Sequence, residues 1–106
     1  MSQNNTQLQL EAKLFKGFSD PSRLAILELL SEKPLSVSEI VEKTGLSQPN
    51  VSMHLACLLG CGLLQNKKDR RNSYYELSGN DVREIIKMAR KVISEHIKEI
   101  FECTRY

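Results

Sequence analysis

Apolar residues recur at helical spacing in five segments of the chain, and two short strand-like runs lie before the last of them. The first expected helix covers LQLEAKLFKGF and places Leu8, Leu14, Phe15 and Phe18 at roughly helical spacing. The polar residues 1–6 before it are expected to be disordered. A second, mostly buried helix follows in SDPSRLAILELLSE, because its Asp-Pro start combines a capping side chain with proline at the first helical position.

The middle of the chain predicts two helices joined by a tight turn. Ser36 and Glu39 form a capping box that begins the short helix VSEIVEKT, and Gly45 ends it. Ser47 caps the next helix, SQPNVSMHLACLLGC, which a further glycine stops. Residues 36–61 therefore predict a helix-turn-helix.

A hairpin and a final helix complete the expected fold. LLQNKK and SYYEL read as strands separated by the charged tip DRRN, so residues 64–77 predict the wing of a winged helix. Residues 81–103 contain no Gly or Pro and predict one long helix. The expected fold class is mainly α with a small β-hairpin, a single winged helix-turn-helix domain over residues 1–106.

The final helix carries more apolar residues than one face of a small domain needs: Ile85, Ile86, Ala89, Val92, Ile93, Ile97, Ile100 and Phe101. The surplus, together with the apolar first helix, most simply packs against a second copy of the chain. We therefore expect a homodimer formed through the first and last helices.

Composition and charge narrow the function. The chain has 106 residues, 41% of them hydrophobic and 26% charged, with a net charge of +2, which is typical of a globular domain. Residues 44–75 carry four basic side chains against the single acid Asp69, and this balance suits a polyanionic partner. Neither histidine lies in a recognisable catalytic arrangement and no Gly-rich phosphate loop is present, so no enzyme activity is expected.

The same composition bears on location. No apolar run approaches the roughly 20 residues needed to span a bilayer, so no membrane partner is expected. The start MSQNNTQLQL lacks the basic and apolar regions of a signal peptide, and we expect a cytoplasmic protein. Three cysteines, an odd number, argue against a disulfide framework in a reducing compartment.

Two cysteines lie four residues apart in the second helix of the helix-turn-helix. At 100° per residue, Val51, Leu55, Leu58 and Leu59 define its core face. Asn50, Met53, His54, Cys57 and Cys61 then point away from the core. Thiols at this spacing are too far apart for a relaxed disulfide, but one metal ion could bridge them. A free cysteine is more often a small buried hydrophobic residue. The helical positions of Cys57 and Cys61 argue against burial for both.

These segments resemble a known family. SDPSRLAILELL, LSVSEIVEKTGLSQPNVSMHLACLLGCGLL and RRNSYYEL are similar to the ArsR/SmtB family of metal-sensing winged-helix repressors. NVSMHLACLLGCGLL resembles the recognition helix of the CmtR type of cadmium/lead sensor. In that type two helix cysteines join a third from the C-terminal region, reported to come from the partner subunit, and FECTRY supplies Cys103. The resemblance thus implies a metal site of Cys57, Cys61 and Cys103 for cadmium(II) or lead(II), with no organic cofactor.

The chain also departs from the family pattern. The positions of the Cys-x-Cys pair of many relatives hold Ser36 and Ser38, so we expect that site to be absent. A zinc site on the last helix would need ligands where Arg83 and Ile85 stand, although His96 and Glu99 match its other half. By itself the soft thiolate set leaves arsenite, mercury and copper(I) as alternatives to cadmium and lead. His54 is a possible extra donor, but we expect it to belong with the DNA-contacting residues.

The expected partner is double-stranded operator DNA. Gln48, Asn50, Ser52 and His54 should face base edges, and Lys68, Arg70 and Arg71 of the wing should meet phosphates or a minor groove. A dimer should bind an inverted repeat. The predicted function is repression of transcription, with release of DNA when a soft heavy metal binds.

Two other functions remain open. In the first, thiol oxidation rather than metal releases the repressor from DNA. In the second, the winged helix serves only protein contacts, which the acid-poor segment argues against.

Overall fold

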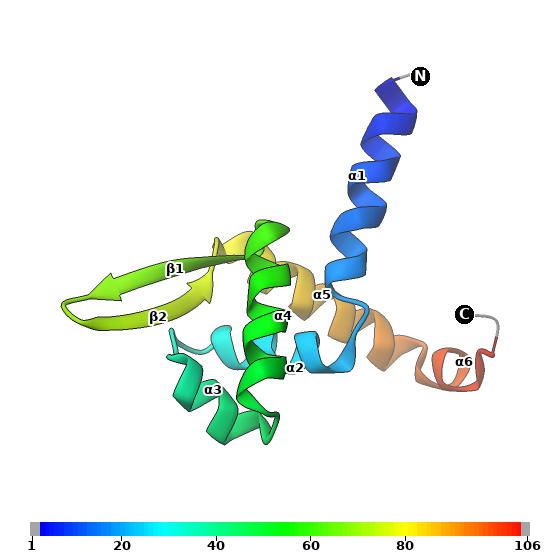
Figure 1. Cartoon of the computed structure of the whole chain (residues 1–106). Helices are drawn as coiled ribbons and strands as arrows, with labels where there is room; N and C mark the ends of the chain where they lie inside the picture. Colours follow the sequence, from blue (N-terminus) through cyan, green and yellow to red (C-terminus); the bar gives the residue numbers. More distant parts are fainter. Residues whose placement is uncertain (1–2, 105–106) are drawn as a thin grey trace.

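The computed structural model describes residues 3–104, which form six helices and one antiparallel hairpin (Figure 1). In chain order they are α1 (Gln3–Gly17), α2 (Pro21–Leu30), α3 (Val37–Thr44), α4 (Gln48–Gly60), β1 (Leu64–Asp69), β2 (Asn72–Leu77), α5 (Asn80–Glu95) and α6 (Ile97–Glu102). The fold is mainly α with a two-stranded sheet, as the sequence predicts. None of the described helices is long and apolar enough to cross a membrane.

Side chains begin three of the helices as their sequences predict. Asp20 accepts a hydrogen bond from the backbone N–H of Arg23 at 3.0 Å, and this bond lowers the pKa of Asp20. Ser36 and Glu39 form the reciprocal capping box, with bonds of 3.2 and 3.0 Å. The hydrogen bonds from Ser36 likewise lower the pKa of Glu39. Ser47 caps α4 by accepting from the backbone N–H of Asn50 at 3.3 Å.

The hairpin β1–β2 projects from the helices as a narrow wing (Figure 1). Its strands pair from Leu64 with Leu77 to Asp69 with Asn72, which leaves two arginines at the tip. The wing is fixed to the helices because Tyr75 and Leu35 exchange two backbone hydrogen bonds, of 2.8 and 3.0 Å. The wing therefore has a defined position relative to the start of α3.

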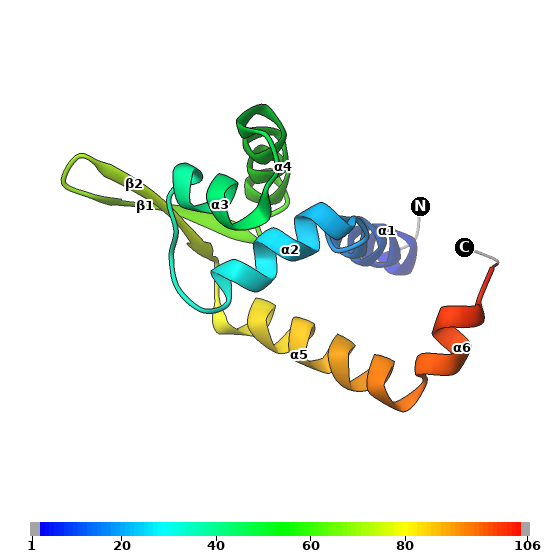
Figure 2. The ribbon, with the colours of Figure 1, turned by 90° about the horizontal axis from the view of Figure 1, so that it is seen from below.

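One apolar core holds the helix-turn-helix, the base of the wing and the start of α5 together. Figure 2 shows α2 lying between α4 and α5. The buried residues are Ile26, Leu27, Leu30, Leu35, Ile40, Val51, Leu55, Leu58, Leu63, Leu64, Leu77, Val82 and Ile86. Because α4 contributes three of them, its orientation is set by the core.

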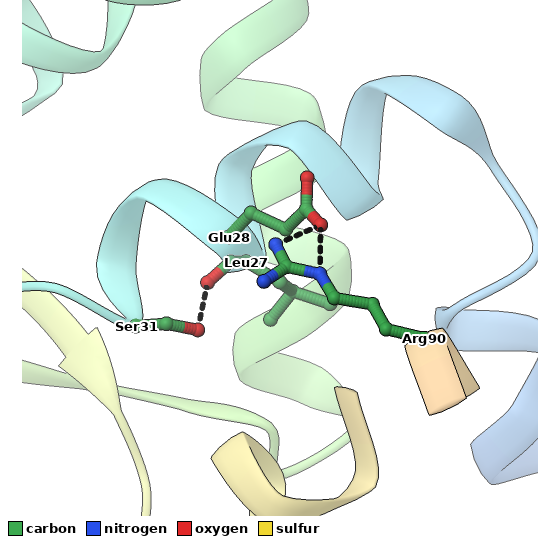
Figure 3. Close-up of polar contacts among 4 residues, drawn as sticks. All are labelled: Leu27, Glu28, Ser31 and Arg90. Atoms are coloured by element: carbon green, nitrogen blue, oxygen red, sulfur yellow. Dashed lines mark hydrogen bonds and ion pairs between the residues drawn. The ribbon is translucent and has the colours of Figure 1, made fainter. Parts of the chain in front are cut away.

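Polar contacts join α5 to α2. The guanidinium of Arg90 forms an ion pair with Glu28 and donates to it from Nε at 3.1 Å (Figure 3). Nε of Arg83 donates to the carbonyl of Ser31, at the end of α2, at 2.9 Å. Helix α5 is thus attached to the scaffold of the helix-turn-helix by packing at its start and by hydrogen bonds as far as Arg90.

The expectation of one helix over residues 81–103 is wrong, because the structure breaks it at His96. There the backbone takes φ −133° and ψ 32°, and α6 continues in another direction (Figures 1 and 2). The absence of Gly and Pro indicates only that the local sequence can form a helix, and does not show that the helix is continuous. No residue after Ile86 is buried in the described chain, so no tertiary packing of the protomer holds this end straight.

The expectation of a disordered segment over residues 1–6 is wrong for residues 3–6, which begin α1. Residues 1 and 2 lie outside the described residues. A helix can extend by one exposed turn without burying side chains, so the apolar pattern that starts at Leu8 underestimates its length.

Replacing Leu58 with alanine should lower the free energy of unfolding by about 3 kcal/mol, because the side chain is fully buried and its removal leaves a cavity. Met53 is on the same helix and 59% exposed, so Met53→Ala should change stability by less than about 0.5 kcal/mol. Urea denaturation followed by circular dichroism measures the free energy of unfolding of both variants. Equal losses would contradict the assigned core face of α4.

Candidate functional site

Helix α4 presents a polar surface at its start. Gln48, Asn50 and Ser52 are exposed, while Val51 and, one turn later, Leu55 are buried. The core face of the helix therefore fixes the direction of the exposed amide and hydroxyl groups. Amides of this kind can pair with adenine in the major groove of DNA.

His54 lies differently from the other three candidates. Its side chain is half-buried, and its charge contributes to lowering the pKa of Asp20 after the larger effect of the Arg23 backbone N–H. The imidazole is therefore close to the start of α2. This position places it at the border between the exposed face of α4 and the scaffold.

The wing carries the basic candidates. Lys68 lies on β1 opposite Ser73, and Arg70 and Arg71 form the hairpin tip, where Arg70 adopts φ 60°. All three basic side chains are exposed, and neither of the ion pairs among the described residues involves them. Their charges are thus available to an anionic partner.

The two thiols of α4 differ in exposure. Cys57 is exposed, whereas Cys61 is half-buried and packs against the core. The expectation that both point outward is therefore wrong for Cys61. Helix α4 ends at Gly60, and Leu10 and Leu14 of α1 line a cavity with Cys61 that an angular reading of α4 alone does not detect.

The thiols nevertheless lie one helical turn apart. The backbone N–H of Cys61 donates to the carbonyl of Cys57 at 3.0 Å, which is the spacing that brings side chains at i and i+4 together. Cys103 follows α6 and is exposed. No group of three or more His, Cys, Asp or Glu side chains within residues 3–104 could hold a metal ion. Cys57 and Cys61 are thus one helical turn apart along the backbone, and they form no metal-binding group with Cys103 among the described residues.

Other positions discussed from the sequence have structural roles. Ser36 caps α3, and Arg83 donates to Ser31 and, at 2.7 Å, to Asn80. Ile85 lines an apolar hollow on α5, and His96 marks the helix break.

Exposed large apolar side chains lie on α1, α5 and α6, and we call them together the apolar surface. They are Leu8, Leu10, Phe15, Met88, Val92, Ile93, Ile97, Ile100 and Phe101. Two hollows of about 200 and 360 Å³ lie on it, and Phe15, Ile85 and Ala89 line both. The surplus apolar positions of the first and last helices indicate this surface in the sequence. The cavity beside Cys61 has no comparable sequence signal, because it depends on how α1 packs.

The chain is similar to known regulators. Residues 20–66 match the family model described as "Bacterial regulatory protein, arsR family". A probable mercury resistance operon repressor of Streptomyces lividans is 32% identical over 94 residues, covering 89% of this chain and 75% of that protein. The uncharacterised HTH-type transcriptional regulator Rv0081 of Mycobacterium tuberculosis is 33% identical over 92 residues, covering 86% of this chain and 81% of that protein.

Solved structures share the fold. The crystal structure of Rv0081 superposes with a TM-score of 0.82 at 31% identity, over 90% of this chain and 96% of that one. The solution structure of the homodimeric winged helix-turn-helix DNA-binding domain Mb0332 from Mycobacterium bovis gives a TM-score of 0.84 at 26% identity, over 93% and 92%.

Cys57 should react with iodoacetamide several times faster than Cys61 in the reduced, folded protein, because Cys57 is exposed whereas Cys61 is half-buried. Timed alkylation followed by peptide mass spectrometry measures both rates, and the same reaction in denaturant is the control. Equal rates in the folded protein would contradict the packing of Cys61 against the core.

Proposed function

The chain belongs to the ArsR family of bacterial transcriptional regulators, and from that premise we propose that it is a metal-responsive repressor. In this proposal a homodimer binds operator DNA and is released when cadmium(II) or lead(II) binds Cys57, Cys61 and Cys103. The observation that carries the proposal is the position of Cys57 on α4 and of Cys61 one turn later, at the end of the helix whose exposed polar side chains would contact DNA.

DNA binding would use α4 and the wing together. Gln48, Asn50 and Ser52 would contact base edges, with His54 at the border of that surface. Lys68, Arg70 and Arg71 would meet phosphates or a minor groove. Two copies related by a twofold axis would then bind an inverted repeat, with half-sites about one helical turn apart.

The thiol pair suits a soft cation. Thiolates select polarisable cations over magnesium or calcium, and side chains at i and i+4 can share one ion. The two cysteines of α4 therefore fit as two of three ligands, and three sulfurs suit lead(II), or cadmium(II) with a further donor. The mercury resistance function named for the Streptomyces lividans relative supports an effector of this soft class.

The third ligand would come from a second copy. Cys103 does not lie with Cys57 and Cys61 in the protomer, and α6 before it has no buried residue. Phe101, two residues earlier, is 89% exposed. The apolar surface over α1, α5 and α6 would be covered in a dimer, and the homodimeric state of the Mycobacterium bovis domain supports this assembly.

Metal would act directly on the DNA-reading element. The three cysteines would bind as thiolates, held in position by the protein. The metal ion would join them through its bonds to sulfur. Linking the end of α4 to the C-terminal segment would restrain the orientation of its first turns. Such coupling between two sites is typically worth about 1–3 kcal/mol.

Replacing Cys57 or Cys61 with serine should leave operator affinity within about twofold and abolish its loss on adding cadmium, because serine oxygen is a poor ligand for soft cations. Fluorescence anisotropy with labelled operator DNA measures the affinity without cadmium and its loss when cadmium is added. A variant that loses DNA binding and metal response together would argue against separate reading and sensing residues. Release by peroxide but not by cadmium would instead support a thiol-redox repressor, since Cys57 and Cys103 are free and exposed.

Replacing Arg71 with alanine should weaken binding to operator and random DNA by similar factors and reduce the slope of log affinity against log salt by about 1. The reason is the loss of one phosphate contact from the wing. Lys91→Ala on α5 removes the same charge from an exposed position outside the wing and serves as control. An unchanged slope for Arg71→Ala would contradict the phosphate contact.

A further inference from the structure

Met53 is the residue of α4 that points most directly away from the core. The buried residues of this helix are Val51, Leu55 and Leu58. At 100° per residue, Met53 lies about 200° from the first two and about 140° from the third. Its side chain is 59% exposed, whereas those of Leu55 and Leu58 are at most 1% exposed. The outermost position of the helix is therefore apolar.

The neighbours of Met53 on the outer side of α4 carry no charge. Pro49 lies one turn before it and Ala56 one turn after it, and both are exposed. Asn50, three residues before Met53, is exposed as well. The sequence of α4 contains no Lys, Arg, Asp or Glu. The outer face of the helix thus combines amide groups at its start with an apolar strip.

Met53 lies apart from the surface that we assign to a second copy. The hollows of about 200 and 360 Å³ on the apolar surface are lined by side chains of α1, α2 and α5 and by Phe18. Figure 2 shows α4 and α5 on opposite sides of α2. The side chain of Met53 is therefore available to a partner that approaches the outer face of α4, which in the proposed function is the major groove of DNA.

The major groove offers one prominent apolar group to such a side chain. Thymine carries its C5-methyl group there, whereas the other bases are distinguished by hydrogen-bond donors and acceptors. Asn and Gln pair with adenine, and guanine is most often bound by Arg or Lys, which α4 lacks. The amides and the apolar strip of α4 therefore both suit A·T base pairs.

We propose that Met53 is a specificity-determining residue of α4, whose thioether side chain contacts a thymine methyl group, so that the helix selects A·T-rich half-sites. This inference rests on the proposed binding of operator DNA and is independent of the proposed metal site. The contact would remove one methyl group from water, and apolar burial of that size changes affinity about fourfold.

The test removes the methyl group from the DNA. Wild type selects its operator from a pool of random duplexes, and each thymine of the selected half-sites is replaced with uracil, which lacks only the C5-methyl group. Fluorescence anisotropy with the reduced full-length protein measures the affinity for each duplex. Uracil at one thymine of a half-site should weaken wild-type binding about fourfold. Uracil outside the half-sites should leave the affinity unchanged.

Variants of Met53 separate the contact from an effect of uracil on the shape of DNA. Met53→Ala should bind the thymine and uracil duplexes with equal affinity, because the side chain that contacts the methyl group is removed. Met53→Leu keeps a large apolar side chain and should retain the difference. Half-sites without thymine, wild-type binding that is insensitive to every uracil, or an equal methyl effect in wild type and Met53→Ala would each overturn the contact.

The same measurements distinguish this inference from the proposed function. Failure of wild type to select any DNA sequence would overturn the proposed operator binding together with the role of Met53. A methyl effect that depends on Met53, in a complex that cadmium does not release, would overturn the metal response alone and support the contact.

Discussion

The burial of one face of α4 determines where every other side chain of that helix points. Val51, Leu55 and Leu58 pack into the core formed with α2, α3 and the base of the wing, so the helix cannot rotate without exposing them. Removing such side chains from a core typically costs several kcal/mol each. The polar start of α4 and the thiol at Cys57 are consequently held on its exposed side. A ligand at the thiols and DNA at the first turns would therefore act on one rigid element.

Helix α5 connects this element to the surface that we assign to a second copy. It is buried at Val82 and Ile86 in its first half, and the contacts of Arg83 and Arg90 attach it to α2. Beyond Ile86 its apolar side chains are exposed, and α6 continues them in a new direction. A dimer formed there would place two copies of α4 in a fixed relation, which is what half-site spacing on DNA requires. The same arrangement would bring Cys103 to the other copy's thiols.

Local chemistry made most of the fold predictable. The capping box at Ser36 and Glu39, the cap at Ser47 and the charged tip of the hairpin are each set by neighbouring residues, and the structure contains all of them. The break at His96 and the partial burial of Cys61 depend instead on what packs, or fails to pack, against those residues. Neither feature can be predicted from the spacing of apolar residues along a single helix. The position of Cys103 relative to the other two thiols is also outside what local sequence predicts, because it depends on packing, and the three cysteines form no metal-binding group among the residues that the structure describes.

We propose that one soft cation joins Cys57 and Cys61 to Cys103. X-ray absorption spectroscopy of the reduced protein loaded with cadmium counts the sulfur atoms bound to the metal. We expect three sulfur neighbours in the wild-type protein and two after Cys103→Ser. A count of two in the wild type, unchanged by Cys103→Ser, would contradict it.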